Sequence, residues 1–306
     1  MPEVRPLAPD DYEDLYRTFL VSGDSRRSSE TYRPMFAPGI SLDDRIGYGL
    51  MDKGRLVGML GTIASRRVWS GHPEVVCNLH SWSVLPEYRG YSLLLMRPVL
   101  GVADWTLTDL SPTPTVMAIS LRLGFRPLDG RLTILRRTRG GGRTEEPGVD
   151  VCSDRSRVRE RSRTDDPTAR AAIDDASLQP LLLTDAKGEC LVLARRVDRD
   201  CRPHCHVHHV SDPARFVRWS LTARNALLQL CGGDFVVVDR RRIGEARLPA
   251  SITLPVSSRQ LVRPGRTSSG EVDSLRSELQ YLGMTTLPEK RLYLDAVKSR
   301  FRRFFQ

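Results

Sequence analysis

The feature that most constrains this chain is an apolar, strand-like segment that runs directly into a turn and then into a helical pattern. Residues 77–84 form the strand-like segment, Gly90 lies in the turn, and residues 93–103 follow with helical spacing. A turn that opens a helix leaves several backbone N–H groups unpaired and pointing one way, which suits a phosphate or pyrophosphate group. Gly90 lets an anion approach the backbone closely, and Arg89 adds positive charge. The segment therefore predicts an anion-binding turn.

Strand-like and helical patterns alternate through the first half of the chain. Residues 4–7 form a short strand, and the helix that follows ends near Leu20. Two strands, 46–51 and 55–67, join across the turn 52–54. Further strands are predicted at 74–84, 105–109 and 132–137, and further helices at 93–103 and 115–123. Together these elements predict an α/β fold with a mixed sheet.

Residues 139–176 interrupt this pattern, because they are rich in charge and have almost no apolar periodicity. This composition predicts a mixed-charge flexible linker. The formal net charge of the whole chain is +10, which favours anionic partners in general. The arginines of the linker are matched by acidic residues, however, and no aromatic residues lie among them. We therefore expect no nucleic-acid partner.

The order hairpin, strand, helix, strand and helix recurs after the linker. The second set is predicted as a hairpin at 181–184 and 189–197, strands at 205–210 and 234–239, and helices at 213–230 and 272–282. This recurrence predicts an internal repeat, with domains at 1–138 and 177–288. No glycine lies between Gly188 and Gly232. We therefore expect the second domain to lack a phosphate-binding turn.

The first half resembles the GNAT superfamily of acyl-CoA-dependent N-acyltransferases. The resemblance covers roughly residues 1–137 and rests on the segments 4–11, 56–61, 84–92 and, downstream, the Leu-Arg-Leu-Gly-Phe sequence at 121–125. It implies a GNAT-like acyltransferase fold for the first domain. With the recurrence of elements, it also implies a second, GNAT-like domain after the linker, one that has lost the cofactor.

The family's pyrophosphate motif, Gln/Arg-x-x-Gly-x-Gly/Ala, falls here on Glu87, Gly90 and Ser92. Gly90 matches, Ser92 is another small residue, and Glu87 replaces a residue that usually donates hydrogen bonds. The resemblance implies acetyl-CoA, or another acyl-CoA, as co-substrate. The implied cofactor-binding residues are Trp82, Ser83, Val84, Glu87, Tyr88, Arg89, Gly90, Tyr91, Ser92, Leu93 and Thr113.

The resemblance also implies direct transfer of the acyl group to an amine of a small molecule or amino sugar. Direct transfer needs a base for the proton of the amine. With period-two alternation, His80 and Trp82 share one face of their strand. The ordinary pKa of histidine is near neutrality, so His80 suits a general base, and a hydrogen-bonded structural histidine is the alternative. Asp109 and Glu74 are further candidates for the base.

The group that protonates the leaving thiolate is harder to assign. The family often places a tyrosine four residues before the glycine of Leu-Gly-Phe, and that position here is Ser120. Ser120 could bond to the sulfur or hold a water molecule, or Tyr91 could reach the site from the turn. The departures at Ser120 and Glu87 leave a second interpretation open, a non-catalytic acyl-CoA-binding or sensing protein.

Residue types that bind metals gather between Cys201 and His209. In a strand, His204, His206 and His208 share one face, and three such histidines can bind zinc. No second pair of ligands follows at metal-binding spacing, so no metal is expected. A strand that lines a substrate cleft and a plain structural strand are the alternatives. For the cleft, the acceptor-side candidates are His206, His208, Asp212 and Glu278.

Three further expectations concern the whole chain. No apolar run is long enough to span a membrane and the N-terminus has no signal-peptide core, so a cytoplasmic protein is expected. The cysteines lie mostly in apolar contexts and are expected to be buried, reduced thiols. Residues 289–306 are predicted as a basic amphipathic helix that either docks on its own domain or makes weak contact with a membrane surface.

Overall fold

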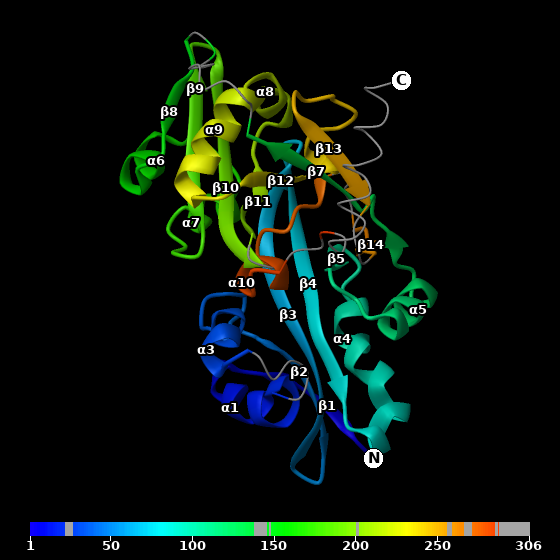
Figure 1. The fold of residues 1–306 in the computed structure, drawn as a ribbon. Coiled ribbons are helices and arrows are strands. Elements are labelled where there is room, and N and C mark those ends of the chain that lie inside the picture. The colour runs from blue at the N-terminus through cyan, green and yellow to red at the C-terminus, as the bar shows by residue number, and fades with distance from the viewer. Residues whose placement is uncertain are drawn as a thin grey trace, which may run out of the picture. The chain divides into compact units, whose positions relative to one another are not determined.

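The computed structural model describes residues 1–21, 27–137, 146, 148–199, 202–255, 259–265, 271–284 and 287. These residues form two compact α/β units, and neither unit is a single continuous piece of chain. Unit 1 comprises Met1–Pro127, Gln260–Ser269 and Arg276–Leu282, and unit 2 comprises Leu128–Arg259, Gly270–Leu275 and Gly283–Gln306. The α/β fold class predicted from the sequence is confirmed (Figure 1).

Unit 1 is built on a mixed sheet with the strand order β1-β2-β3-β4-β5-β14-β6. Its strands are β1 (Glu3–Leu7), β2 (Gly47–Asp52), β3 (Arg55–Trp69), β4 (His72–Val84), β5 (Trp105–Asp109), β6 (Arg126–Pro127) and β14 (Leu261–Arg263). Strands β4 and β5 run parallel, and the other neighbours are antiparallel. The predicted hairpin across residues 52–54 is present as β2 and β3.

Helices cover both faces of this sheet (Figure 1). On one face, α1 (Tyr12–Leu15), the π-helix η2 (Tyr16–Leu20), α3 (Ser29–Tyr32) and the 3₁₀ helix η3 (Arg33–Phe36) bury Leu15, Phe19 and Phe36 against Met59 of β3. On the other, the 3₁₀ helix η4 (Pro86–Met96), α4 (Arg97–Leu100) and α5 (Pro114–Arg122) pack against Leu60 and Cys77. The short helix α10 (Glu278–Tyr281) completes unit 1.

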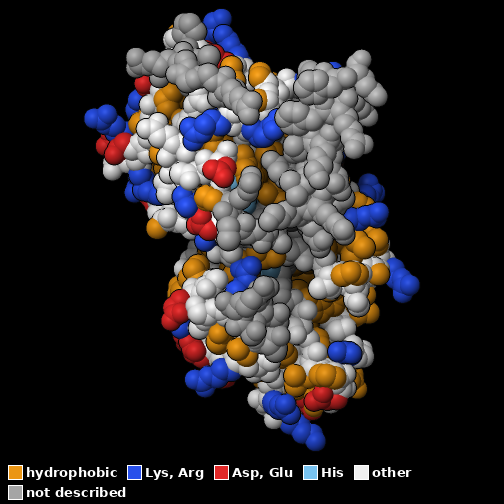
Figure 2. Space-filling model, in the orientation of Figure 1, with side chains coloured by type: hydrophobic (Ala, Val, Ile, Leu, Met, Phe, Trp, Pro, Cys, Tyr) orange, Lys and Arg blue, Asp and Glu red, His pale blue; other side chains and the backbone are white. Residues whose placement is uncertain are grey.

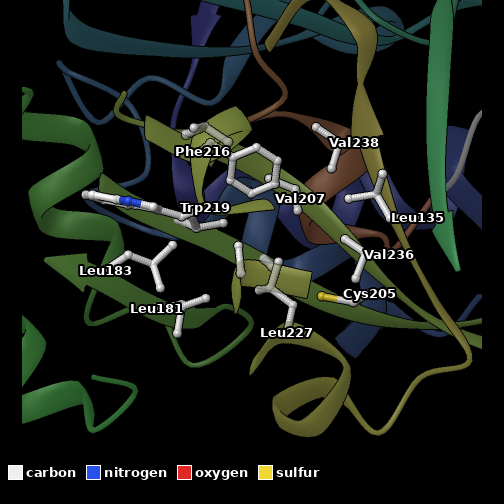
Figure 3. Packing of buried hydrophobic residues seen from close by; sticks show 14 of the residues in the cluster. Leu135, Leu181, Leu183, Cys205, Val207, Phe216, Trp219, Leu227, Val236 and Val238 are labelled. Atoms are coloured by element: carbon white, nitrogen blue, oxygen red, sulfur yellow. The ribbon is translucent and has the colours of Figure 1, made fainter. Parts of the chain in front are cut away.

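Unit 2 has the strand order β13-β7-β12-β11-β10-β9-β8. Its strands are β7 (Arg131–Arg136), β8 (Asp150–Cys152), β9 (Gln179–Asp185), β10 (Gly188–Arg199), β11 (Arg202–Val210), β12 (Phe235–Asp239) and β13 (Ser251–Pro255). Helices α8 (Pro213–Arg218) and α9 (Ser220–Cys231) pack against them, where Phe216, Trp219 and Leu227 are buried with Val236 and Leu135 (Figure 3).

The two units share one pattern of strand pairing. In unit 1, the hairpin β2–β3 is followed by β4, which pairs antiparallel with β3 and parallel with β5. In unit 2, the hairpin β9–β10 is followed by β11, which pairs antiparallel with β10 and parallel with β12. The recurrence of elements predicted from the sequence is therefore present in the pairing.

Each sheet also takes a strand from a part of the chain that the sequence assigned to the other domain. Strand β7, predicted at 132–137 as the last strand of the first domain, lies between β12 and β13 in unit 2. Strand β14 follows β13 in the chain, yet it lies between β5 and β6 in unit 1. Local patterns identify a strand but not its partner, so this division into discontinuous units was not visible in the sequence.

The segment predicted as a flexible linker, 139–176, is folded over most of its described length. It forms β8, α6 (Arg155–Arg161) and α7 (Pro167–Ala172). The side chains of Asp154 and Asp166 accept hydrogen bonds from the first amides of α6 and α7. Val158 and Ala169 are buried in an apolar cluster. Asp154 and Asp166 are therefore helix caps, and Pro167 is the first residue of α7.

Three predicted helices differ from the observed ones. An α-helix at 93–103 is replaced by η4 and then α4, because Pro98 lacks an N–H and fits only in the first turn of an α-helix. The helix at 213–230 is divided at Trp219 into α8 and α9. In 272–282 only α10 is helical, because Asp273 and Ser274 bond to histidines of β11 instead.

Charge and cysteine placement bear on the remaining expectations. On the visible face, Lys and Arg side chains are scattered and acidic side chains lie among them (Figure 2).

The cysteines in the described part of the chain are buried free thiols, and Cys201 lies outside that part. Within the described ranges, no helix is long and apolar enough to cross a membrane. The predicted C-terminal helix, 289–306, lies outside the described residues.

Replacing Leu261 with alanine tests whether β14 completes the sheet of unit 1. The side chain is fully buried in the core of unit 1, so Leu261→Ala should lower the free energy of unfolding by about 2–5 kcal/mol. Urea unfolding measures the loss, and hydrogen exchange of the β5 amides locates it. Leu121→Ala, at a site that is 39% exposed, is the control and should change stability by less than about 0.5 kcal/mol. Equal, small effects would show that β14 does not stabilise this sheet.

Candidate active site

The parallel pairing of β4 with β5 ends inside unit 1. It runs from Val75 opposite Trp105 to Asn78 opposite Thr108. The Asn78 Nδ2 donates to Thr108 Oγ1 at 3.2 Å, so a side-chain hydrogen bond joins the last pair. Past this pair, residues 79–82 of β4 and the end of β5 line a cavity of about 220 Å³. The cavity therefore lies where the two strands separate.

This cavity brings together five residues that the sequence proposed for catalysis or cofactor binding. They are His80, Trp82, Asp109, Thr113 and Ser120. His80 and Trp82 come from β4, Asp109 ends β5, and the other two belong to the start and middle of α5. Strand ends and a helix start thus converge on one cavity.

A β-bulge in β4 changes which side chains share a face. Ser81 has a φ of 52°, and the pairing with β3 shifts so that Ser81 and Trp82 both lie opposite Leu60. As a result, Trp82 packs in the same core cluster as Leu79, whereas His80 stacks edge-on against Phe36 at 5.3 Å on the other face. The expectation that His80 and Trp82 share one face is therefore wrong, because the bulge interrupts the alternation.

His80 is held in a tight, apolar setting. Its side chain is only 6% exposed, and burial lowers its pKa to about 3. Its Nδ1 lies 3.2 Å from Ser81 Oγ, and its Nε2 has no hydrogen-bond partner among the described residues. The ring lies directly over Gly61 of β3, where a Cβ atom would overlap it. His80 is thus neutral at physiological pH.

Asp109 and Glu278 are two buried carboxyl groups, and the charge of Glu278 acts on Asp109. Asp109 is 8% exposed and Glu278 is 3% exposed. Burial raises the pKa of Asp109 to about 8, and the charge of Glu278 contributes to the rise. Burial also raises the pKa of Glu278, while a hydrogen bond of 2.7 Å from Ser111 Oγ to its Oε1 opposes that rise. Asp109 therefore holds a proton over much of the neutral range.

The start of α5 forms the wall of the cavity next to Asp109. Thr113 is the N-cap of this helix, and its Oγ1 accepts from Val116 N at 3.3 Å. Pro114 follows as the first helical residue, which favours a sharp start. Ser120 lies two turns further on and is buried. The hydroxyl groups of α5 thus face the same cavity as the carboxyl group at the end of β5.

The predicted anion-binding turn has fewer free backbone amides than its sequence indicated. Residues 86–96 form η4, and in a 3₁₀ helix each amide bonds to the carbonyl three residues earlier. The amides of 90–93 are therefore used within η4, and unpaired N–H groups are confined to its first turn. Arg89, Gly90 and Tyr91 are exposed, and the Tyr88 hydroxyl donates to Asp52 at 2.8 Å.

Other candidates are not among the residues that line this cavity. Glu74 precedes the parallel ladder, whereas the cavity follows it, and it accepts a hydrogen bond of 2.7 Å from Thr106. Asp212 caps α8 and forms an ion pair with Arg215. His206 and His208 are buried in unit 2 and stacked with ring centroids 4.8 Å apart. None of these four residues lines the unit 1 cavity.

Two features of the site were missed or misplaced in the sequence. Glu278 was assigned to the acceptor side of the second domain, but it lies in unit 1 beside Asp109. Nothing near Glu278 in the sequence signals this contact. The role of Gly61 was also missed, although a glycine inside an apolar strand is a known sign of close approach by another group. Among the described residues, no group of three or more His, Cys, Asp or Glu side chains could hold a metal ion.

Comparison with known proteins shows the fold. No family model and no curated protein matches the sequence. A GCN5-related N-acetyltransferase of Anabaena variabilis is 10% identical, with a TM-score of 0.55 over 86% of this chain and 72% of that one. A probable N-acyltransferase of Enterococcus faecalis is 11% identical, with a TM-score of 0.52 over 88% and 74%. A proposed acetyltransferase of Pyrococcus horikoshii is 16% identical, with a TM-score of 0.50 over 90% and 92%.

The chain therefore has the fold of the GNAT superfamily, as the resemblance implied, and the likeness extends over most of its length. The matched structures are those of an N-acetyltransferase and of proteins assigned as an N-acyltransferase and an acetyltransferase.

Gly61→Ala tests the position of His80. The added methyl group would overlap the imidazole ring, so the ring or β3 must shift, at a cost of about 1–3 kcal/mol in the free energy of unfolding. Chemical denaturation measures this cost. Gly90→Ala is the control for stability, because a Cβ atom there would meet open space. The same stability for both variants would contradict the observed packing of His80 on Gly61.

The raised pKa of Asp109 makes stability depend on pH. Between its unfolded value near 3.8 and its folded value of about 8, the folded chain binds more protons, so the free energy of unfolding falls as pH rises. Asp109→Asn removes this contribution. From about pH 5 to about pH 9, the variant should therefore lose less stability, by about 1.4 kcal/mol for each pKa unit removed. Denaturation at both pH values checks this, and parallel losses would contradict a buried, protonated Asp109.

Proposed function

We propose that the chain is an acyl-CoA-dependent acyltransferase that moves an acetyl or other short acyl group to an amine of a small molecule or amino sugar, with unit 1 as the catalytic unit. The observation that carries the proposal is the cavity where β4 separates from β5 in a GNAT fold. It is lined by a bulged strand, a helix start and a carboxyl group with a raised pKa. A titratable group with a strongly shifted pKa in a cavity favours a functional site.

The acyl-CoA is proposed to lie along the separated end of β4. Backbone groups of Trp82, Ser83 and Val84 follow the bulge and belong to the part of β4 that no longer pairs with β5. Such groups can bond to the amides of the pantetheine arm and polarise the acyl carbonyl. The pyrophosphate is proposed to bind at the exposed residues of η4, near Arg89 and Gly90. Because the amides of η4 bond within the helix, binding of the pyrophosphate there depends more on side-chain charge than it would in a turn with free amides.

The proton of the attacking amine is proposed to pass to Asp109 rather than to His80. A general base works best when its pKa is near the working pH. The pKa of His80 is lowered to about 3, so His80 is a weak base, whereas the pKa of Asp109 is raised to about 8. His80 then serves as a neutral group that lines the cavity. Ser120 is proposed to face the leaving sulfur, directly or through a water molecule.

Unit 2 is proposed to carry no acyl-CoA. The position in β11 that corresponds to the bulge of β4 is occupied by the chain itself, because His208 Nδ1 lies 2.8 Å from Ser274 Oγ. Next to it, His209 Nδ1 lies 2.8 Å from Asp273 Oδ2, with both side chains buried. These contacts, together with the lack of a phosphate-binding turn after β11, support a structural role for the unit.

A non-catalytic acyl-CoA-binding or sensing protein is the second candidate. Ser120 stands where the family often has an acidic tyrosine, and the closed amides of η4 depart from an open phosphate turn. The residue at Ser120 bears on the catalytic step alone, whereas the amides of η4 bear on cofactor binding, which both candidates require. The two functions differ in one measurable way, since only an enzyme releases free CoA in the presence of an amine.

Acetyl-CoA should bind to the unmodified full chain in a calorimetric titration. Gly90→Asp places a negative charge at the proposed pyrophosphate site and should weaken binding by about tenfold or more, or about 1.4 kcal/mol. Gly71→Asp, at an exposed turn between β3 and β4, adds the same charge elsewhere and should leave affinity unchanged. If the unmodified chain binds no acetyl-CoA, both candidate functions fail. Release of CoA with a panel of amines then separates the enzyme from the sensor.

A further inference from the structure

We propose that Cys205 and Cys231 are a redox-active pair, which a hydroperoxide converts from two thiols into a disulfide bond in the core of unit 2. Cys205 lies in β11, the central strand of the sheet, and Cys231 is the last residue of α9. The disulfide ties the helix to the sheet that it covers. This inference does not depend on the proposed acyl transfer, because both residues belong to unit 2.

The two sulfur atoms are already close together. Cys231 Sγ donates to Cys205 Sγ at 2.8 Å. A disulfide bond is about 2.05 Å long, so the two atoms need to approach by less than about 1 Å. Both side chains are buried, with 0% exposure for Cys205 and 2% for Cys231, in the apolar cluster that also holds Leu227 and Val236 (Figure 3). Forming the bond therefore needs a small adjustment of side chains and no change of fold.

The loop after α9 keeps the end of the helix against β11. A Cβ atom on Gly233 would lie only 2.9 Å from His204 Cα and 3.1 Å from the amide nitrogen of Cys205. The absence of a side chain at Gly233 thus allows the loop backbone to lie directly on β11. The next amide, Asp234 N, donates to the carbonyl oxygen of Pro203 at 2.9 Å. These backbone contacts fix the end of α9 beside Cys205.

Cys190 in the same apolar cluster is a buried thiol without a sulfur partner and serves as the comparison. Its Sγ donates to the carbonyl oxygen of Asp212 at 3.4 Å, and burial raises its pKa to about 12. Among the cysteines of the described ranges, Cys205 and Cys231 are the two whose thiols bond to each other. Oxidation is therefore expected to be selective for this pair.

A positive charge lies at the end of α9 where Cys231 is located. Arg196 Nη1 donates to the carbonyl oxygen of Cys231 at 2.8 Å and to that of Gly232 at 3.2 Å. The pKa of Arg196 is raised, chiefly by its hydrogen bond to Asp198, and the charge of Cys231 contributes to the rise. The reacting form of a cysteine is the thiolate, which a nearby cation stabilises. Arg196 therefore favours Cys231 as the thiol that reacts first.

The last turn of α9 gives the oxidant access to Cys231. The ends of a helix open locally at a lower cost than its centre. Gly232, which follows Cys231 and ends the helix, is exposed. Hydrogen peroxide is only slightly larger than water, so opening of this one turn is sufficient. Cys205 lies in a central strand, and burial raises its pKa well above the usual value for a thiol, so it reacts second.

The proposed reaction needs only the two thiols and the peroxide. The Cys231 thiolate attacks one oxygen of hydrogen peroxide, the O–O bond breaks, and a sulfenic acid and a hydroxide ion form. The sulfur of Cys205 then attacks the sulfur of the sulfenic acid. An S–S bond forms, the S–O bond breaks, and the thiol proton of Cys205 leaves with the oxygen as water. The two cysteines are thereby oxidised, and the peroxide is reduced to water.

The test uses the full chain, first reduced and then treated with hydrogen peroxide under native conditions. The remaining thiols are alkylated after unfolding and counted by intact mass measurement. The treated chain should lose the mass of two hydrogen atoms and carry two fewer alkyl groups than the untreated chain. Peptide mapping without reductant should find Cys205 joined to Cys231, with Cys190 still a thiol.

The disulfide should also stabilise unit 2, because it joins two residues 26 positions apart and so restricts the unfolded chain. Peroxide treatment should raise the urea midpoint of unfolding by at least about 0.5 M. Cys205→Ala and Cys231→Ala should each abolish this rise. Cys190→Ala, a buried cysteine of the same cluster, is the matched control and should show the full rise.

The contribution of Arg196 is tested by the rate at which the disulfide forms. Arg196→Gln removes the charge and should slow the reaction by at least about threefold, since less of Cys231 is then ionised. Arg196→Lys keeps the charge and should restore most of the rate, which a purely structural role of the guanidinium group would not allow. The same rate in Arg196→Gln as in the unmodified chain would contradict this role.

A peroxide-treated chain in which Cys205 and Cys231 are both alkylated, or in which either is joined to a different cysteine, would overturn the proposal. Oxidation of Cys231 to a sulfinic acid while Cys205 stays a thiol would overturn it as well, because the two sulfur atoms would then have failed to couple. The peptide map is made on the unmodified chain, so it decides the question even if a cysteine variant does not fold.

Discussion

The end of the parallel pairing between β4 and β5 is the constraint on which the candidate site depends. Up to Asn78 and Thr108 the strands are joined by backbone pairing and by a side-chain hydrogen bond. After this pair, the bulge at Ser81 turns β4 and the strands no longer pair. The backbone groups that lose their partners there need another one, because buried unpaired groups are costly. The cavity is therefore a consequence of the sheet, and the side chains around it decide what it can bind.

Burial then changes what those side chains can do. In water, histidine would be the base near neutrality and aspartate would be fully ionised. Inside unit 1, His80 has a pKa of about 3 and Asp109 a pKa of about 8, because desolvation disfavours the charged form of each. Burial thus lowers the pKa of the histidine and raises the pKa of the aspartate. A choice of base made from free pKa values favours His80, and the structure favours Asp109.

Much of the fold could be predicted from the sequence, because periodic segments and turn residues indicate elements locally. The hairpins across 52–54 and 185–188 and the strand β12 lie where the patterns placed them. The bulge at Ser81 could not be predicted, since serine carries no preference for a positive φ. The partners of β7 and β14 could not be predicted either, because pairing over long sequence distances leaves no local signal. Asp154 and Asp166 were mistaken for linker residues, because a helix cap and a loop residue have the same composition.

The residues of the candidate site also divide into those that local sequence signals identified and one that they did not. Five of its residues were found because they lie on or next to β4, β5 and α5, which local patterns and the GNAT resemblance identified. Glu278 was assigned elsewhere because 167 residues separate it from Ser111, its hydrogen-bond partner. That separation has a consequence for how the site forms. β5 can complete its pairing only when β14 has joined it, and β14 and Glu278 arrive on the same distant part of the chain. The hydrogen bond from Ser111 to Glu278 and the sheet edge beside Asp109 are therefore completed only when unit 1 is fully folded.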